Sequence, residues 1–398
     1  MSATALPAFR LHIHPKHLLE LKKDVWSDEA VPGMLLTGSA KTPVAVSYRG
    51  AHTRKLTKKS YFIQYPDNKE KAAFHLNAEY HDPSFIRNRL SFHFFEQIGV
   101  LAPAASHVFL YINEKKEGIY LKIESVDDHF LKRRNLERGA IYYAVDDDAN
   151  FSLLSSFNKK AKQNLMQGYE RKTGSSRHDD YLQEFIYFIN TAKDDIFEKE
   201  IKRYLDVKQY LLWLIGAVYT QNFDGFVHNY ALYLNGRTKT FQIIPWDYDA
   251  TWGRNIHGEE MEHNRIPAKG YNTLSARLLD IPAFQSQYFN LMKNVLHRQF
   301  TISRLSRYAV NWHETIAPFL EHDPYTTVTY SRLEDEQKQI FHFIDQRKRF
   351  LLFELFPIID CRCPPKKMSH FLSYWRKKSL LHKIRYTSNI KDINALNT

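Results

Sequence analysis

The strongest constraint on the fold comes from residues 222–249, which predict a β-hairpin with acidic residues beyond both of its strands. Asn235-Gly236 is a strong turn signal within the β-type stretch 230–244. If the turn has two residues, the pairing continues until Asp224 lies opposite Asp247, and a longer turn shifts the pairing by a few residues. Either register returns the end of the second strand to the residues that precede the first.

The open end of this hairpin gathers oxygen ligands. The two-residue turn also puts Asn229 beside Gln242, and either register brings Asp247 and Asp249 near Asp224 and Asn229. Like charges repel and are costly to bury, so three converging carboxylates and an amide predict a hard cation such as Mg²⁺. Asp224 and Asn229 have the D-x-x-x-x-N spacing of a kinase catalytic-loop base and its metal-binding amide. In the structural alternative, Asp224 caps a turn and Asp247 is buried; we favour the functional interpretation.

A basic stretch at residues 49–61 supplies the opposite charge. Its cations lie on or beside a strand, a loop and a second strand, where Arg54 and its neighbours can surround a triphosphate in place of a glycine-rich loop. Strand alternation sends Lys58 and Lys59 to opposite faces, so only one of them points inward. The alternative is a solvated basic edge that discourages aggregation. The predicted phosphate-binding residues are Arg49, Arg54, Lys58 and Lys59.

Hydrophobic periodicity predicts an α+β protein in which a small β-rich part precedes a larger helical part. Strand-like runs and one helix, residues 85–98, occupy the first third, and long helices dominate from residue 179 onward apart from the hairpin. Residues 146–177, rich in Asp, Asn, Ser, Lys and Gln, predict a mobile insertion. The expected parts are residues 1–145, 146–360 and a basic tail, 361–398.

Composition excludes several classes of protein. The chain of 398 residues has a net charge of +12, but nine Lys/Arg and one acid after residue 360 supply +8 of it, so overall basicity does not predict nucleic-acid binding. The longest strongly apolar run, residues 211–219, is too short to cross a bilayer. Two cysteines, Cys361 and Cys363, are too few for a disulfide framework. We expect a soluble, intracellular protein that binds neither nucleic acid nor membrane.

Six ordered motifs between residues 40 and 300 resemble the spore coat protein H (CotH) kinases, an atypical family related to protein kinases. They are R-G-x-x-x-R with K-K-S-Y at 49–61, D-P-S-F-I-R-N at 82–88, Y-I-N-x-x-x-x-G-I-Y-x-x-x-E at 111–124, D-G-F-x-x-N-Y at 224–230, P-W-D-Y-D-A-T-W-G at 245–253 and N-T-L-x-x-R-L-L at 272–279. The resemblance implies a bilobal kinase-like fold. It also implies Mg²⁺-dependent transfer of phosphate from ATP to Ser or Thr of spore coat proteins in the cytoplasm of the sporulating mother cell and on the coat.

The resemblance also assigns roles by position. Asp224 resembles the catalytic aspartate, Asn229 a metal-binding amide and Asp247 the main Mg²⁺ ligand, with Asp249 a second ligand or a support. Tyr142, Tyr143 and Trp246 are candidates to stack on adenine, with core packing as the alternative. Residues 124–126 are candidates for the hinge, and Glu96 is a candidate partner of the phosphate-binding lysine.

Two other functions fit the sequence. Asp247-Tyr248-Asp249 is a D-x-D motif, which in glycosyltransferases binds Mn²⁺ and a nucleotide sugar through the same hard oxygen ligands, and Mn²⁺ is also possible in a kinase. A non-catalytic scaffold for coat assembly is the third hypothesis. Phosphate transfer from ATP that is lost in Asp224→Ala and Asp247→Ala would distinguish a kinase from a glycosyltransferase.

Overall fold

The computed structural model describes residues 6–66 and 70–355. The described residues up to 351 form one compact unit. The basic tail 361–398 and both cysteines therefore lie outside the described part. The architecture is α+β, as predicted; the division into two lobes at residue 145 stays a prediction.

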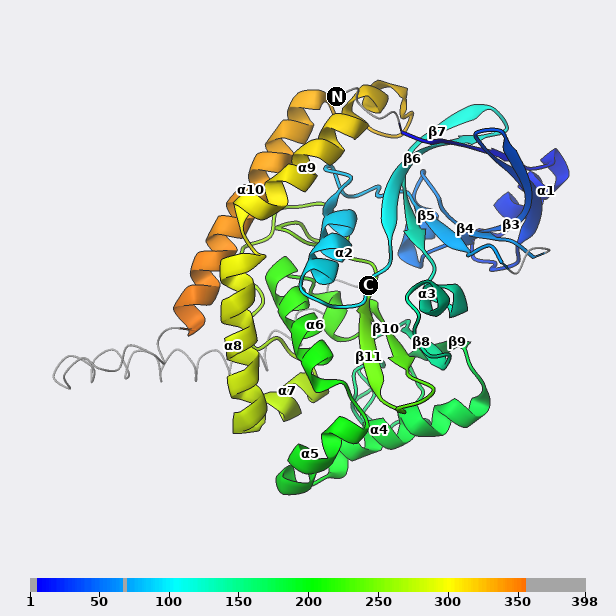
Figure 1. Ribbon diagram of the computed structural model, residues 1–398. Helices are drawn as coiled ribbons and strands as arrows, with labels where there is room; N and C mark the ends of the chain where they lie inside the picture. Colours follow the sequence, from blue (N-terminus) through cyan, green and yellow to red (C-terminus); the bar gives the residue numbers. More distant parts are fainter. Residues whose placement is uncertain (1–5, 67–69, 356–398) are drawn as a thin grey trace. The chain divides into compact units, whose positions relative to one another are not determined.

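The N-terminal strands close into a barrel, which the sequence did not predict (Figure 1). Around the barrel the strands follow the order β1-β2-β3-β4-β5-β7-β6, and β6 returns to lie parallel to β1. Alternate side chains fill the interior, among them Leu11, Val46 and Ile63, none of which is exposed to solvent. The strands are β1 (Ala8–His12), β2 (Val31–Thr37), β3 (Ala40–Arg49), β4 (Ser60–Gln64), β5 (Phe74–Asn77), β6 (Ala105–Ile112) and β7 (Lys115–Glu124).

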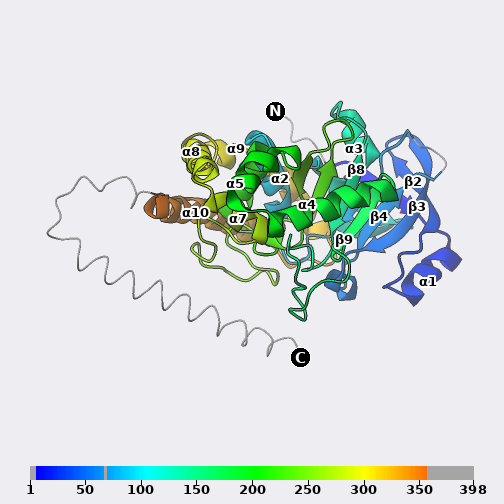
Figure 2. The ribbon, with the colours of Figure 1, turned by 90° about the horizontal axis from the view of Figure 1, so that it is seen from below.

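A second sheet of four strands carries the predicted hairpin and has the order β11-β10-β8-β9. Strand β8, which the predicted boundary at residue 145 assigns to the first part, pairs with β10 of the second part. Figures 1 and 2 place this sheet between the barrel and helix α8. The strands are β8 (Ala140–Ala144), β9 (Tyr169–Thr173), β10 (Tyr230–Leu234) and β11 (Phe241–Pro245).

Helices supply most of the remaining core. Helix α6 is apolar on every face and its side chains from Tyr210 to Thr220 are buried, because α2, α8 and β11 all contact it. Its N-cap is Asp206, whose side chain accepts a hydrogen bond from the backbone N–H of Gln209 (3.1 Å). The helices are α1 (Pro15–Lys23), α2 (Arg87–Gln97), α3 (Asp128–Arg133), α4 (Asp179–Thr191), α5 (Asp194–Glu200), α6 (Val207–Thr220), α7 (Thr273–Asp280), α8 (Pro282–Arg298), α9 (Ile302–Ile316) and α10 (Tyr330–Leu355).

Short 3-10 turns complete the described elements. Two of them border the region of predicted functional residues, one in the basic stretch and one at the start of the acidic segment. They are η1 (His52–Lys55), η2 (Ser176–His178), η3 (Ile201–Arg203), η4 (Asp224–Phe226) and η5 (Ala317–His322). None of the described helices is both long enough and apolar enough to cross a membrane.

The hairpin forms, but the predicted two-residue turn is wrong. Tyr230 pairs with Pro245 and Leu234 with Phe241, so the turn is longer and the register is shifted. Gln242 therefore lies opposite Tyr233 rather than beside Asn229. A hydrogen bond within the turn explains the longer connection, since the N–H of Lys239 donates to the carbonyl of Asn235 (2.9 Å).

Residues 146–177 are linked to one another by polar side chains and include β9 of the second sheet. The Asp148 carboxylate accepts hydrogen bonds from the hydroxyl of Ser155 (3.0 Å) and the N–H of Ser156 (2.6 Å). The Lys162 ammonium donates to Asn150 (2.9 Å). The polar composition that predicted a mobile insertion thus serves an internal hydrogen-bond network.

Candidate active site

The two ends of the hairpin meet in left-handed backbone. Asn229 precedes β10 and Asp247 follows β11, and both have a φ of 58°. Asn and Asp tolerate this region better than other residues with a Cβ, because their short polar side chains bond locally. The N–H of Trp246 donates to the carbonyl of Asn229 (3.0 Å), so Asn229 lies next to Asp247 in space. The shifted register therefore still brings the predicted amide and carboxylate together.

Asp224 reaches the same place from the other direction, in the 3-10 turn that follows α6. The side chain of Asn222 braces this turn: it accepts from the N–H of Gly225 (2.9 Å) and donates to the carbonyl of Asp247 (3.3 Å). One amide thus fixes the distance between the two acidic segments. Sequence reasoning did not single out Asn222, although it lies within the predicted segment.

The carboxylate of Asp224 is partly buried and close to other charges. Burial raises its pKa, and the neighbouring charges of Asp147 and Asp247 add to that effect, while His228 opposes it. His228 lies 3.9 Å from the Asp224 carboxylate through Nε2 and 2.7 Å from Asp147 through Nδ1. Asp147, in the insertion, therefore orients the imidazole beside Asp224.

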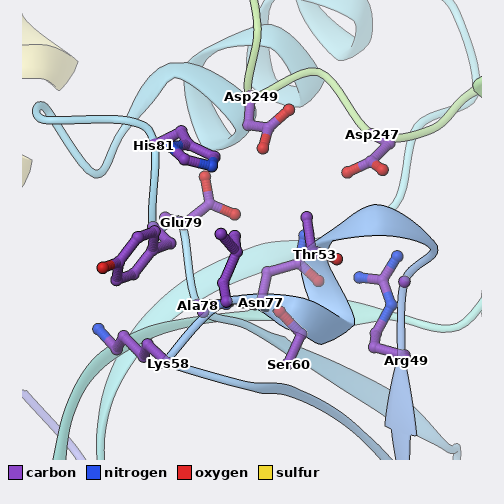
Figure 3. Close-up of a pocket in the computed structure, with 13 residues that line it drawn as sticks. Arg49, Thr53, Lys58, Ser60, Asn77, Ala78, Glu79, His81, Asp247 and Asp249 are labelled. Carbon is purple, nitrogen blue, oxygen red and sulfur yellow. Dashed lines mark hydrogen bonds between the residues drawn. The ribbon is translucent and has the colours of Figure 1, made fainter. Parts of the chain in front are cut away.

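A cavity joins the basic and acidic segments (Figure 3). Its volume of about 40 Å³ leaves room for an ion and a few water molecules, not for a whole nucleotide. The barrel supplies one side and the segment after β11 the other. The cavity is lined by Arg49, Gly50, Thr53, Leu56, Lys58, Ser60, Asn77, Ala78, Glu79, Tyr80, His81, Asp247 and Asp249.

Asp249 and Glu79 are the most perturbed acids of this cavity. Burial, followed by the charges of Asp247 and Asp82, raises the pKa of Asp249 to about 7. Burial and the same group of carboxylates, Asp249 first, raise the pKa of Glu79 well above its ordinary value. The sequence analysis did not identify Glu79, which follows β5 and has a left-handed φ of 48°. The motif at residues 82–88 was the only nearby signal.

Of the predicted phosphate-binding residues, Arg49 faces the cavity. Its guanidinium lies 5.4 Å from the ring of Trp246, a cation–π contact, and its Nη1 atom is buried with no hydrogen-bond partner among the described residues. The charge of Arg49 lowers the pKa of Asp249, which is the expected effect of a nearby cation. Arg49 and Asp249 therefore interact electrostatically, and both line the cavity with Asp247.

The guanidinium of Arg54 does not line the cavity, contrary to the prediction. It donates to the carbonyls of Gly50 (2.6 Å) and Trp26 (2.8 Å) and contacts the carboxylate of Asp28. The Lys59 ammonium donates to the carbonyl of Arg54 (2.5 Å) and is also absent from the lining. These contacts occupy both side chains in holding the loops around η1.

Lys58 is the inward lysine, and its partner is not Glu96. Its ammonium donates to the carboxylate of Asp323 (2.7 Å) and the carbonyl of Ile119 (2.7 Å). Burial lowers the pKa of Lys58, and the charge of Asp323 opposes that shift. Glu96 is exposed on α2.

The aromatic candidates differ in position. Trp246 is 8% exposed and packs edge-on against Tyr143 (5.2 Å between ring centroids) and His75 (5.0 Å). Tyr142 is fully buried and its hydroxyl donates to Asp179 on α4 (3.1 Å), which leaves no free ring face for adenine. The prediction for Tyr142 is therefore wrong, because β8 turns this ring into the core.

The oxygen ligands fit a magnesium ion only in part. Within residues 6–66 and 70–355, no three His, Cys, Asp or Glu side chains form a ready-made metal cluster. Mg²⁺ is commonly held by one or two carboxylates and takes its other ligands from water and substrate phosphates. Asp247, with the adjacent Asn229, meets that smaller requirement.

Comparison with known proteins identifies the family. A model of the family described as CotH kinase protein matches residues 46–351. The chain belongs to this family. The resemblance drawn from the six motifs is thereby confirmed.

CotH-family relatives extend the match over nearly all of the chain. It is 46% identical to inner spore coat protein H of Bacillus subtilis (strain 168) over 349 residues, which cover 87% of this chain and 96% of that protein. It is 36% identical to the inner spore coat protein H-like protein of the same strain, covering 84% and 96%. Spore coat protein homolog 1 of Rhizopus delemar is 23% identical, covering 61% and 41%. Relatives of this chain are thus spore coat proteins.

A solved kinase structure is much less similar to this CotH-family chain than the spore coat relatives are. The crystal structure of a Helicobacter pylori proinflammatory kinase, CtkA, aligns with 75% of this chain and 93% of its own at 10% identity. The TM-score of 0.32 is too low to establish a common fold.

Proposed function

We propose that this protein transfers the γ-phosphate of ATP to serine or threonine side chains of spore coat proteins, with Mg²⁺, and so supports coat assembly. One observation carries the proposal: the unpartnered guanidinium nitrogen of Arg49 and the carboxylates of Asp247 and Asp249 belong to a single small cavity. Phosphoryl transfer needs this combination, because a phosphate is anionic and its charge is balanced by cationic side chains and a metal.

Asp224 is the proposed base that orients the substrate hydroxyl and accepts its proton. Its carboxylate is partly exposed, so the side chain of a protein substrate can reach it. Its raised pKa makes it a stronger base than an exposed aspartate. His228, held by Asp147, supports the ionised form of Asp224 through its positive charge.

Arg49 is the proposed ligand of the nucleotide phosphates, and Asp247 with Asn229 would hold the metal. A bound Mg²⁺ supplies positive charge that neutralises the phosphate oxygens. Asp249 adds negative charge beside Asp247. Trp246 and Tyr143 remain the proposed aromatic neighbours of adenine. The adenine ring would lie outside the cavity, because a volume of about 40 Å³ is too small for a whole nucleotide.

The CotH family and the names of the relatives support the substrate class. Two relatives that match over most of their length are spore coat proteins. We place the activity in the cytoplasm of the sporulating mother cell and on the coat. Phosphoamino-acid analysis of labelled coat protein would distinguish serine and threonine from tyrosine as acceptors.

The test is transfer of labelled γ-phosphate from ATP to isolated coat proteins in the presence of Mg²⁺. Asp224→Asn and Asp247→Asn should each lower the rate by at least about 100-fold, since a base contributes roughly 10²–10⁴-fold. Asp195→Asn, an exposed aspartate of α5, is the matched control and should keep full activity. Full activity of Asp224→Asn, or hydrolysis of a UDP-sugar in place of ATP, would overturn the proposal.

A further inference from the structure

The barrel side of the cavity carries buried oxygen atoms that have no hydrogen-bond partner among the described residues. They are Oε2 of Glu79 and Oδ1 of Asn77, on side chains that are 4% and 6% exposed. Both residues line the cavity together with Asp249. Figure 3 shows the carboxylates of Glu79 and Asp249 turned toward one another. A buried polar group without a hydrogen-bond partner destabilises a fold, and does so more when it is charged.

The position of Glu79 is built into the fold. The side-chain amide of Asn88 donates to Oε1 of Glu79 (3.2 Å), and its carbonyl oxygen accepts from the N–H of Tyr248 (3.1 Å). One asparagine therefore ties Glu79 to the backbone between Asp247 and Asp249. This tie leaves Oε2 as the atom without a partner.

The nearby cations do not provide that partner. The Lys58 ammonium is shared by Asp323 and the Ile119 carbonyl, both at 2.7 Å. The guanidinium of Arg49 lies against the ring of Trp246, and neither its Nη1 atom nor Oε2 of Glu79 has a hydrogen-bond partner among the described residues. The barrel side of the cavity consequently combines two carboxylates and an amide oxygen with too little positive charge.

We propose that Glu79, Asp249 and Asn77 form a divalent-cation subsite on the barrel side of the cavity, separate from the pair Asp247 and Asn229. Two carboxylates and one amide, completed by water, are a suitable oxygen set for Mg²⁺ or Mn²⁺. The cavity volume of about 40 Å³ accommodates an ion with part of its water shell. The role of this cation in catalysis rests on the proposed function, but its binding does not.

Mn²⁺ binding without nucleotide tests the subsite directly. Free Mn²⁺ is measured by electron paramagnetic resonance during titration of the full chain. Glu79→Gln keeps the shape of the side chain and removes its charge, and should weaken Mn²⁺ affinity at least tenfold. Asn77→Asp adds a carboxylate ligand and should tighten binding several-fold. Glu96→Gln, which removes an exposed carboxylate of α2, is the matched control and should bind as the wild type does.

Two results would overturn the subsite. In the first, Glu79→Gln melts at a higher temperature than the wild type and binds Mn²⁺ equally well, which would make Glu79 a buried neutral acid. In the second, Asn77→Asp folds and leaves Mn²⁺ affinity unchanged; this variant also decides the matter if Glu79→Gln fails to fold. Mn²⁺ binding that depends on Glu79 in a protein without phosphate transfer would reject the proposed function alone. Phosphate transfer with Mn²⁺ binding independent of Glu79 would reject the subsite alone.

Discussion

Two arginines of one basic stretch, Arg49 and Arg54, use their guanidinium groups differently. Arg54 satisfies backbone carbonyls and Asp28, so Arg54→Met should lower the free energy of unfolding by about 2 kcal/mol. Arg49→Met removes mainly a cation–π contact with Trp246, so this variant should lower the free energy of unfolding by about 1 kcal/mol or less. It should weaken ATP binding about tenfold or more, because it removes a charged hydrogen bond of about 1.5–3 kcal/mol.

Urea unfolding and calorimetric ATP titration of both variants measure these effects. The two substitutions remove the same charge a few residues apart, so each serves as the control for the other. Equal loss of ATP affinity in both, with equal stability, would contradict the separation of roles.

The raised pKa of Asp249 predicts how stability depends on pH. The folded state holds the Asp249 proton with a pKa of about 7, whereas the ordinary value is 3.8. The stability due to this proton is therefore complete below pH 3.8 and is lost as the pH rises through about 7. The unfolding free energy of the wild type should therefore decrease, relative to that of Asp249→Asn, as the pH rises across this window. Urea unfolding in EDTA at several pH values measures it, and parallel pH profiles would contradict the shift.

At the scale of single residues, the sequence motifs predicted candidate site residues, but they did not predict residues that reach the cavity only through the fold. Asp224, Asn229 and Asp247 lie in one continuous segment, so a hairpin of any register brings them together. Glu79 reaches the site only because the barrel closes and Asn88 bridges it to Tyr248. No local pattern encodes that bridge.

At the scale of elements, the crossing of α6 and α2 depends on one glycine. A Cβ at Gly216 would lie 2.1 Å from Cε1 of Phe95 and 2.6 Å from two more ring atoms. Gly→Ala in an open helix stabilises by about 1 kcal/mol. Here overpacking should reverse the sign, so Gly216→Ala should destabilise by about 1–3 kcal/mol.

Chemical denaturation of Gly216→Ala, Phe95→Leu and the double variant measures this contact. The smaller Leu should relieve the clash, so the double variant should be more stable than the sum of the single effects predicts. A Gly216→Ala protein more stable than the wild type would show that the helices shift apart at little cost.

Element type was easier to predict than element pairing. The helical pattern of residues 85–98 located α2 from its own residues, and the strand-like runs of the first third correctly predicted β-strands there. The barrel closes because β1 pairs in parallel with β6, which is distant in the sequence, and the local periodicity of hydrophobic residues does not predict such a pairing. The hairpin register depended on a turn whose length Asn235-Gly236 alone does not fix.

At the scale of the whole molecule, a buried ionic network connects α10 to the acidic cavity. Glu336 of α10, 1% exposed, accepts from Arg87 (2.9 Å) and Arg254 (2.5 Å). Arg87 also holds Asp82 (2.6 Å), and the charge of Asp82 raises the pKa of both Asp249 and Glu79. The C-terminal helix thus shares charged partners with residues at the cavity.

Glu336→Gln should therefore destabilise the fold by about 3–5 kcal/mol, because it leaves two buried guanidinium groups without their common carboxylate. Glu334→Gln, an exposed acid of the same helix, is the matched control and should change the free energy of unfolding by less than about 0.5 kcal/mol. Urea denaturation of both variants at neutral pH measures the difference. Equal stabilities would mean that water or rearranged side chains compensate Arg87 and Arg254, and would contradict a stabilising role of this network.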